Sequence, residues 1–204
     1  DVSGSRHFGT LTQMKRDMMA EVAATLAFST IANNDKVGVI FFSDKIEKFI
    51  PAQKGKTHVL HIIRELLSFE PSSTGTDIAQ ALQYFSNAQK RHCTAFLISD
   101  FIGVEGLEKP LMIASNRHEV NAIQIYDRRE TELPNVGLVK FHDAETGQDL
   151  WVDTAVASVR EQYASEWKQN QSRIEQLCTK TGVKRMSVRT DEDYVKALMK
   201  LFKS

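Results

Sequence analysis

Two kinds of hydrophobic pattern alternate along the chain. Nearly continuous apolar runs, such as residues 36–42 and 94–99, are typical of strands that are buried on both faces. Between these runs lie longer segments in which apolar residues recur every three or four positions, which is the period of an amphipathic helix. Strands that alternate with helices of this length predict an α/β fold, a doubly wound and mostly parallel sheet with helices on both faces.

The same patterns set the predicted order of elements along the chain. The predicted strands span residues 36–42, 46–50, 94–99, 119–126 and 183–188, with a β-hairpin inserted at 138–141 and 150–152. The predicted helices span residues 12–32, 57–68, 77–90, 108–117, 154–181 and 190–202. Thr57 is expected to cap the second helix, a capping box at Thr190 and Asp193 to start the last one, and Gly182 to end the long one.

The 204 residues are enough for one domain, which we expect to span residues 1–204. The chain begins at a polar loop, Asp-Val-Ser-Gly-Ser, with no strand before it. In a parallel sheet a ligand-binding loop of this kind follows the carboxyl end of a strand. We therefore expect an extended apolar segment to precede Asp1, and the chain to be a fragment of a longer protein.

Oxygen-bearing side chains gather in three loops of the predicted fold. Asp1, Ser3 and Ser5 form an Asp-x-Ser-x-Ser motif, residues 73–77 read Ser-Thr-Gly-Thr-Asp, and Asp100 follows the strand at 94–99. Mg²⁺ prefers oxygen ligands in near-octahedral geometry and keeps some of its waters, and Mn²⁺ and Ca²⁺ accept the same oxygens. The three loops therefore predict a divalent-cation site, with Mg²⁺ as the expected ion.

The three loops, taken in this order, resemble the metal-ion-dependent adhesion site of von Willebrand factor A domains. The resemblance implies that the metal ligands are Asp1, Ser3, Ser5, Thr76 and Asp100. Thr76 is preferred to Thr74 because residues 76–82, Thr-Asp-Ile-Ala-Gln-Ala-Leu, match the family's pattern. Thr74 and Asp77 are interpreted as caps of the helix that follows them.

Longer stretches of the sequence indicate one particular family among the von Willebrand A-like domains. Residues 1–9 (DVSGSRHFG), 41–78, 97–101 (LISDF) and 126–147 are similar to the bacterial family called domain of unknown function fifty-eight. Its members are von Willebrand A-like domains that are commonly encoded beside MoxR-type AAA+ ATPases. The resemblance implies a non-enzymatic module whose metal accepts an acidic residue of a partner protein, with an AAA+ ATPase as the expected partner.

Several other polar and aromatic residues allow two interpretations. Asp44 is expected to be a hairpin turn residue, although it could also lie at the edge that holds the metal. Residues 127–130, Asp-Arg-Arg-Glu, are interpreted as solvated turn charges rather than as a docking patch. Trp151, Tyr163 and Trp167 are expected to pack against the core or a helix, and an exposed Trp151 would instead indicate a binding surface.

Composition excludes some classes of function. Lys plus Arg equals Asp plus Glu, at 26 each, so no net field attracts nucleic acid. No apolar run approaches the roughly 20 residues that span a bilayer. Cys93 and Cys178 are expected to be reduced thiols, as in a cytoplasmic protein. We expect the domain to be cytoplasmic, in a full-length protein that another segment could attach to a membrane.

Two alternatives to an interaction module remain at this point. The first is a Mg²⁺-dependent phosphotransfer or hydrolase enzyme with Asp1 as its nucleophile. Such sites need a second Asp two positions later, where this chain has Ser3. The second alternative is a scaffold in which the metal site is vestigial. The chain has no Gly-rich phosphate loop and no nucleophile beside a base, so no catalytic residue is predicted.

Overall fold

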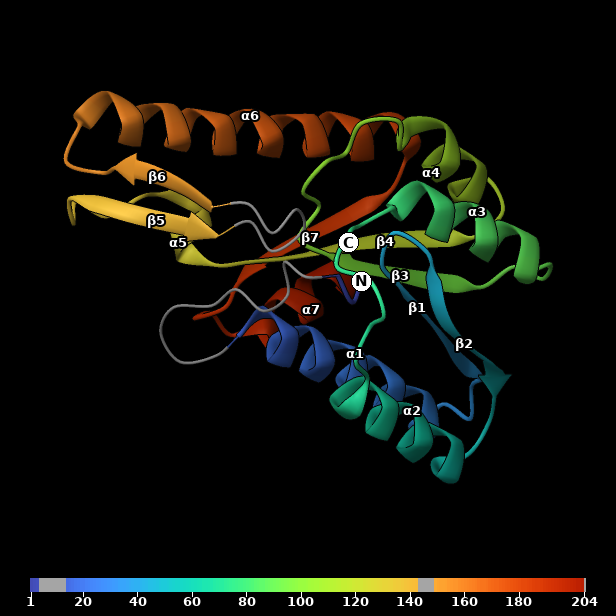
Figure 1. Cartoon of the computed structure of the whole chain (residues 1–204). Helices are drawn as coiled ribbons and strands as arrows, with labels where there is room; N and C mark the ends of the chain where they lie inside the picture. The colour runs from blue at the N-terminus through green and yellow to red at the C-terminus, as the bar shows by residue number, and fades with distance from the viewer. Residues whose placement is uncertain (4–13, 143–148, 204) are drawn as a thin grey trace.

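The centre of the molecule is a three-stranded parallel sheet (Figure 1). The computed structural model describes residues 1–3, 14–142 and 149–203. Strands β3 (Thr94–Ser99), β4 (Glu119–Tyr126) and β7 (Lys184–Arg189) lie side by side with β4 in the middle. Because all three run in the same direction, their carboxyl ends meet at one edge of the sheet.

Helices cover both faces of this sheet, as the sequence predicts (Figure 1). One face packs on α3 (Ile78–Ala88), α4 (Glu108–Ser115) and α6 (Ala157–Thr181). The other packs on α1 (Lys15–Ala32) and α7 (Tyr194–Lys203). Side chains alternate along β4, so that Val120 and Ala122 join the first core, whereas Ile123 and Ile125 join the second.

Two antiparallel hairpins flank the parallel sheet. Strand β1 (Val37–Phe42) pairs with β2 (Ile46–Gln53), and α2 (Lys56–Ser68) follows them. The short α5 (Arg128–Thr131) follows β4 and leads to the second hairpin, β5 (Leu138–His142) and β6 (Asp149–Asp153). This second hairpin is the insertion that the sequence predicts.

The prediction for β1 was wrong in one respect. We expected this apolar strand to be buried on both faces within the parallel sheet. Within the described part of the chain it pairs with β2 alone, and Val37, Val39 and Ile40 are only half-buried. Only its carboxyl end, at Phe41 and Phe42, packs fully into the core. An apolar run therefore identified the strand but not its partners.

Several helix starts also differ from the prediction, and α1 begins at Lys15 rather than at residue 12. Helix α2 begins at Lys56 after Gly55, so Thr57 is not its cap. Helix α6 begins at Ala157 rather than at residue 154. Helix α7 begins at Tyr194, and the Thr190 hydroxyl donates to the carboxylate of Asp127 rather than capping a helix. At the other end of α6, Gly182 has the expected left-handed conformation, with φ of 68°.

Both cysteines are free thiols. None of the described helices is long and apolar enough to cross a membrane.

His118, at the amino end of β4, gives a first testable prediction about stability. Its ring is buried 4.7 Å from that of Phe85, and burial lowers its pKa, helped by the nearby charges of His92 and Arg117. The unfolded chain therefore binds a proton more readily than the folded one as pH falls below about 6.5. We expect the free energy of unfolding to decrease below that pH, at no more than about 1.4 kcal/mol per pH unit from this group.

The measurement is urea unfolding between pH 7.5 and pH 5 for wild type and His118→Gln. The variant should lose part of this pH dependence, whereas His61→Gln, at an exposed position on α2, should keep all of it. If the free energy of unfolding changed with pH equally in wild type and in His118→Gln, His118 would not be a source of this pH dependence.

Candidate metal centre

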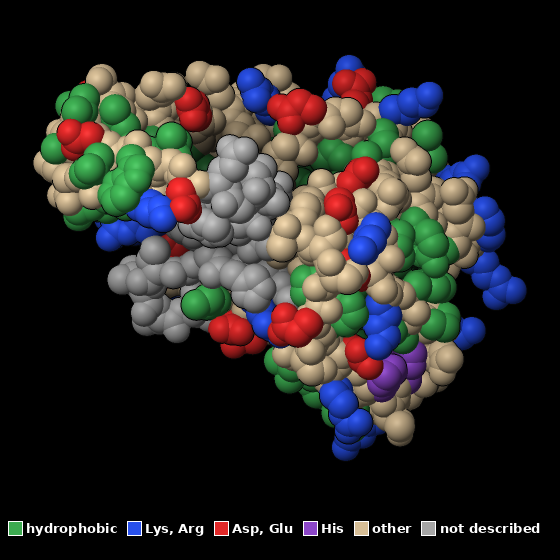
Figure 2. Space-filling model, viewed as in Figure 1, with side chains coloured by type: hydrophobic (Ala, Val, Ile, Leu, Met, Phe, Trp, Pro, Cys, Tyr) green, Lys and Arg blue, Asp and Glu red, His purple; other side chains and the backbone are tan. Residues whose placement is uncertain are grey.

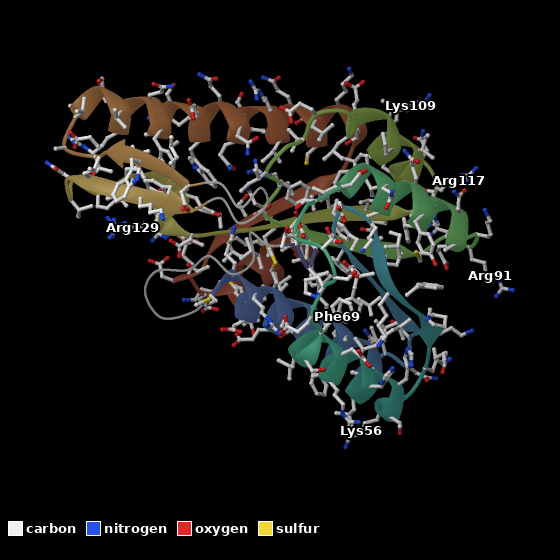
Figure 3. The ribbon with its side chains drawn as sticks, viewed as in Figure 1. Lys56, Phe69, Arg91, Lys109, Arg117 and Arg129 are labelled. Carbon is white, nitrogen blue, oxygen red and sulfur yellow. The ribbon has the colours of Figure 1, made fainter. Side chains whose placement is uncertain are left out.

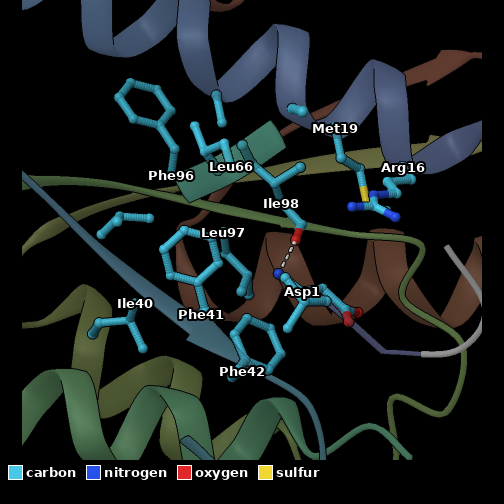
Figure 4. Close-up of a pocket in the computed structure, with 14 residues that line it drawn as sticks. Asp1, Arg16, Met19, Ile40, Phe41, Phe42, Leu66, Phe96, Leu97 and Ile98 are labelled. Atoms are coloured by element: carbon cyan, nitrogen blue, oxygen red, sulfur yellow. Dashed lines mark hydrogen bonds between the residues drawn. The ribbon is translucent and has the colours of Figure 1, made fainter. Parts of the chain in front are cut away.

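Residues 1 and 2 lie between the carboxyl ends of β3 and β1. The backbone nitrogen of Asp1 donates to the carbonyl oxygen of Ile98 at 3.0 Å (Figure 4). The backbone nitrogen of Val2 donates to the carbonyl of Phe42 at 2.8 Å. A largely apolar cavity of about 110 Å³ adjoins them, and side chains of α1, β1, α2 and β3 line it. The start of the Asp-x-Ser-x-Ser motif is thus held at the carboxyl edge of the sheet, where the sequence predicts it.

The Asp1 carboxylate is fixed by hydrogen bonds on both oxygens. Its Oδ1 accepts from the backbone nitrogen of Ser3 at 2.9 Å, and its Oδ2 accepts from the hydroxyl of Ser99 at 2.6 Å. Ser3 itself is fully buried. A carboxylate oxygen can accept more than one hydrogen bond or bind a cation, so Asp1 has the ligand chemistry that the motif predicts. These contacts join the Asp1 loop to the end of β3.

Asp100 follows β3 in a tight turn that its own side chain stabilises. Its Oδ1 accepts from the backbone nitrogen of Ile102 at 3.2 Å, and its carbonyl accepts from the Gln124 side chain at 3.0 Å. Phe101, next in the chain, has φ of 56°, a left-handed conformation that is costly for a bulky residue. Strain of this kind clusters at functional sites. Asp100 is 2% exposed, so the turn holds a buried carboxylate directly after Ser99, the residue whose hydroxyl binds Asp1.

The loop that carries Thr76 reaches the same edge through β1. The backbone nitrogen of Asp77 donates to the carbonyl of Ser43 at 2.8 Å, directly after the Phe42 that binds Val2. The side chain of Asp77 accepts from the nitrogen of Gln80 at 2.8 Å, which confirms Asp77 as the cap of α3. The structure thus places the Thr76 loop next to the start of the chain.

Asp44 is a turn residue, as expected, and it also lies close to the Thr76 loop. It lies in the turn between β1 and β2, and its side chain packs against the Thr76 loop at Gly75. A Cβ at Gly75 would lie 3.3 Å from the Cβ of Asp44, so the close approach favours glycine there. Ser5, the remaining predicted ligand, lies outside the described residues.

A buried lysine at the site was not predicted from the sequence. Lys15, at the start of α1, is 0% exposed, and its Nζ lies 2.9 Å from Oδ2 of Asp100. The same ammonium group binds the carboxylate of Glu130 on α5. Burial alone would lower the pKa of Lys15, but the charges of Asp100 and Glu130 outweigh it and raise that pKa. For Glu130 burial dominates and raises the pKa, which Lys15 only partly offsets.

The acidic residues after β4 belong to the same network. We interpreted residues 127–130 as solvated turn charges, and this was wrong for two of the four. Asp127 is buried, caps α5 by accepting from the nitrogen of Arg129 at 2.8 Å, and accepts from Thr190 at 2.9 Å. Glu130 faces Lys15. The sequence contained a signal for the burial of Asp127, because this residue directly follows a buried strand, as Asp100 does.

The sequence also contained a signal for Lys15. It precedes Met18, Met19 and Val22 by three, four and seven positions, so it lies on the apolar face of α1. A lysine on such a face needs a buried partner.

The donor set of this edge fits a divalent cation. No three His, Cys, Asp or Glu side chains gather as a metal cluster in the described ranges, so a site there depends on hydroxyl ligands. That chemistry suits Mg²⁺ and does not suit zinc.

Comparisons with known proteins agree with this description of the fold. An uncharacterized protein of Mycobacterium tuberculosis is 29% identical over 208 aligned positions, which cover all of this chain and 65% of the relative. An uncharacterized protein of Mycobacterium avium is also 29% identical, over 76% of this chain and 92% of its own length. The chain therefore spans about two thirds of the length of its Mycobacterium tuberculosis relative.

Two solved structures share the fold. The conserved hypothetical protein BatB of Bacteroides thetaiotaomicron superposes with a TM-score of 0.60 at 17% identity, over all of this chain and 96% of its own. An aerotolerance-related membrane protein of Bacteroides fragilis superposes with a TM-score of 0.65 at 16% identity, over the same shares. The family model described as protein of unknown function DUF58 matches residues 1–173. The chain therefore belongs to the DUF58 family.

Proposed function

We propose that this chain is a non-enzymatic, Mg²⁺-dependent protein-interaction domain of the von Willebrand factor A type. The observation that carries the proposal is the meeting of the Asp1 loop with the Asp100 turn, through Ser99 and Ile98, at the carboxyl edge of the sheet. Ligands of open α/β sheets bind at this edge. Mn²⁺ and Ca²⁺ satisfy the same oxygens.

The proposed ligands divide into charged and neutral groups. Asp1 and Asp100 supply charge, whereas Ser3, Ser5 and Thr76 supply neutral hydroxyls. When bound, the ion supplies an open coordination position for a carboxylate of the partner. The chain's own part is to hold Asp1 and Asp100 in fixed orientations, through Ser99 and Ile102 respectively, before the partner arrives. Such preorganisation reduces the cost of association.

The proposed partner is an AAA+ ATPase of the MoxR type, which follows from the family resemblance. We place the domain in the cytoplasm, where such an ATPase works. The Bacteroides fragilis protein of similar fold is called a membrane protein. A longer protein that is attached to a membrane and exposes this domain to the cytoplasm agrees with that description.

The experiment measures binding between the full-length protein and the MoxR-type ATPase of the same organism, by biolayer interferometry with Mg²⁺ or with EDTA. We expect chelation and Asp1→Asn each to weaken binding at least tenfold, or about 1.4 kcal/mol. Asp35→Asn, an exposed carboxylate just after α1, is the matched control and should change nothing.

Equal affinity with and without chelator would reject the metal-dependent interaction. Metal binding without any effect on partner affinity would favour a vestigial or structural ion. A phosphatase activity that Asp1→Asn abolishes would favour an enzyme.

A further inference from the structure

The β5–β6 hairpin exposes large apolar side chains at one end of the molecule, where hydrophobic side chains gather in the space-filling view (Figure 2). Trp151 is 61% exposed, so its expected packing role was wrong, and Leu138, Leu150 and Val136 are each 64% or 65% exposed. The pairing of Lys140 with Trp151 and of Phe141 with Leu150 puts these two pairs on opposite faces of the hairpin. The hairpin thus exposes apolar side chains on both faces, although the face with Trp151 also carries the ion pair of Lys140 and Asp149.

The face that carries Phe141 and Leu150 borders an apolar pocket of about 190 Å³. Val139 and Phe141 of β5 form one side of the pocket, and Leu133, Pro134 and Val136 form the other. This volume matches one large apolar side chain. Leu150 lies beside Phe141 on the same face, so the apolar surface continues outside the pocket.

Hydrogen bonds hold the walls of the pocket in place. The Thr154 hydroxyl donates to the carbonyl of Gly137 at 2.7 Å and accepts from the nitrogen of Val136 at 3.0 Å. On the other side, the hydroxyl of Tyr163 on α6 donates to the carbonyl of Arg129 at 3.1 Å. A pocket whose walls are fixed in this way loses little entropy when it is filled.

Arg129 adds a positive charge to this apolar pocket. It is one of the lining residues, and its side chain points outward below the hairpin (Figure 3). Its neighbour Arg128 is paired with Glu132, but Arg129 forms no ion pair with any carboxylate in the part of the chain that the structure describes. A guanidinium group beside an apolar pocket favours a ligand that combines an apolar side chain with a carboxylate.

We propose that this pocket is a docking site for a segment of a partner protein that inserts one large apolar side chain and sets a neighbouring Asp or Glu against Arg129. Charge complementarity selects this occupant, because a purely apolar ligand would leave Arg129 beside the pocket without a partner. The proposal does not depend on a metal.

The position of the pocket relates it to the candidate metal centre. Arg129 lines the pocket, and the next residue of α5, Glu130, binds the Lys15 ammonium that contacts Asp100. Both features therefore lie at the carboxyl edge of the sheet.

Selection of random peptides displayed on phage against the full chain tests the proposal. The enriched sequences are expected to pair an aromatic or long aliphatic residue with a nearby Asp or Glu. The Kd of a synthetic enriched peptide, measured in EDTA, should rise at least about tenfold in Arg129→Gln and in Val139→Glu. Because Arg129→Gln changes only a side chain that points outward, it tests the site even if Val139→Glu fails to fold.

Trp151→Ser is the control, since it removes an exposed apolar side chain from the opposite face and should leave the Kd unchanged. Enriched peptides without an acidic residue, or with a Kd that Arg129→Gln does not change, would overturn the proposal. So would an absence of enriched peptides together with binding to vesicles of phosphatidylcholine and phosphatidylglycerol that is lost in Leu150→Ser, which would assign this face to a membrane.

Discussion

Lys15→Met is expected to lower the free energy of unfolding by roughly 3–5 kcal/mol in metal-free buffer, the typical cost of removing one partner of a buried ion pair. The ammonium group is fully buried between Asp100 and Glu130, and its loss leaves one buried and one largely buried carboxylate without this cation. Methionine keeps most of the apolar volume of lysine, so the loss measures charge rather than packing. The measurement is urea unfolding in EDTA.

The response to metal separates this network from an ordinary buried ion pair. Without Lys15 the edge has one more negative charge, so Mg²⁺ should stabilise Lys15→Met by more than it stabilises wild type. Lys56→Met, at an exposed position at the start of α2, is the control and should respond as wild type does. A loss below about 1 kcal/mol in Lys15→Met, the range of a surface pair, would show that the buried network does not form in solution.

Asp100→Ala is expected to weaken both folding and cation binding. The substitution removes one of the two carboxylates that face Lys15 and the acceptor of the Ile102 nitrogen, at a cost of roughly 2–3 kcal/mol. It also removes a proposed metal ligand, so the stabilisation by Mg²⁺ should decrease. The measurement is urea unfolding of the variant with and without Mg²⁺.

Asp191→Ala is the control, because it removes a partly exposed carboxylate after β7 that pairs only with Arg189 among the described residues. Its stability should change by less than about 1 kcal/mol and its response to Mg²⁺ should not change. If Asp100→Ala kept the wild-type response to Mg²⁺, Asp100 would not be a ligand.

Much of the parallel core could be predicted because its signals are local. Residues 94–99 and 119–126 are apolar runs of strand length, and the structure has strands with these bounds. A polar residue that directly follows such a strand must lie at the carboxyl edge of the sheet. Asp100 lies there for this reason, and the Asp1 motif reaches the same edge through Ile98.

The remaining features depend on tertiary contacts that no local pattern contains. The bond from Thr190 to Asp127 joins segments 63 residues apart, so the helix cap predicted at Thr190 did not form. Trp151 was expected to pack because tryptophan usually does, yet its hairpin extends beyond the core. Lys15 gave a local signal, but its partners are 85 and 115 residues away. Local sequence patterns therefore predicted the strands and helices of the core better than the buried polar contacts between them.

A metal centre at the carboxyl edge is tested most directly by calorimetric titration of Mg²⁺ into the full-length protein and its Asp1→Asn variant, after both have been treated with chelator. The variant keeps the shape of the side chain and removes its charge. We expect one saturable site in wild type and an affinity at least tenfold lower in Asp1→Asn. Saturable binding of equal affinity in the two proteins, or no binding in wild type at millimolar Mg²⁺, would contradict a metal centre at this edge of the sheet.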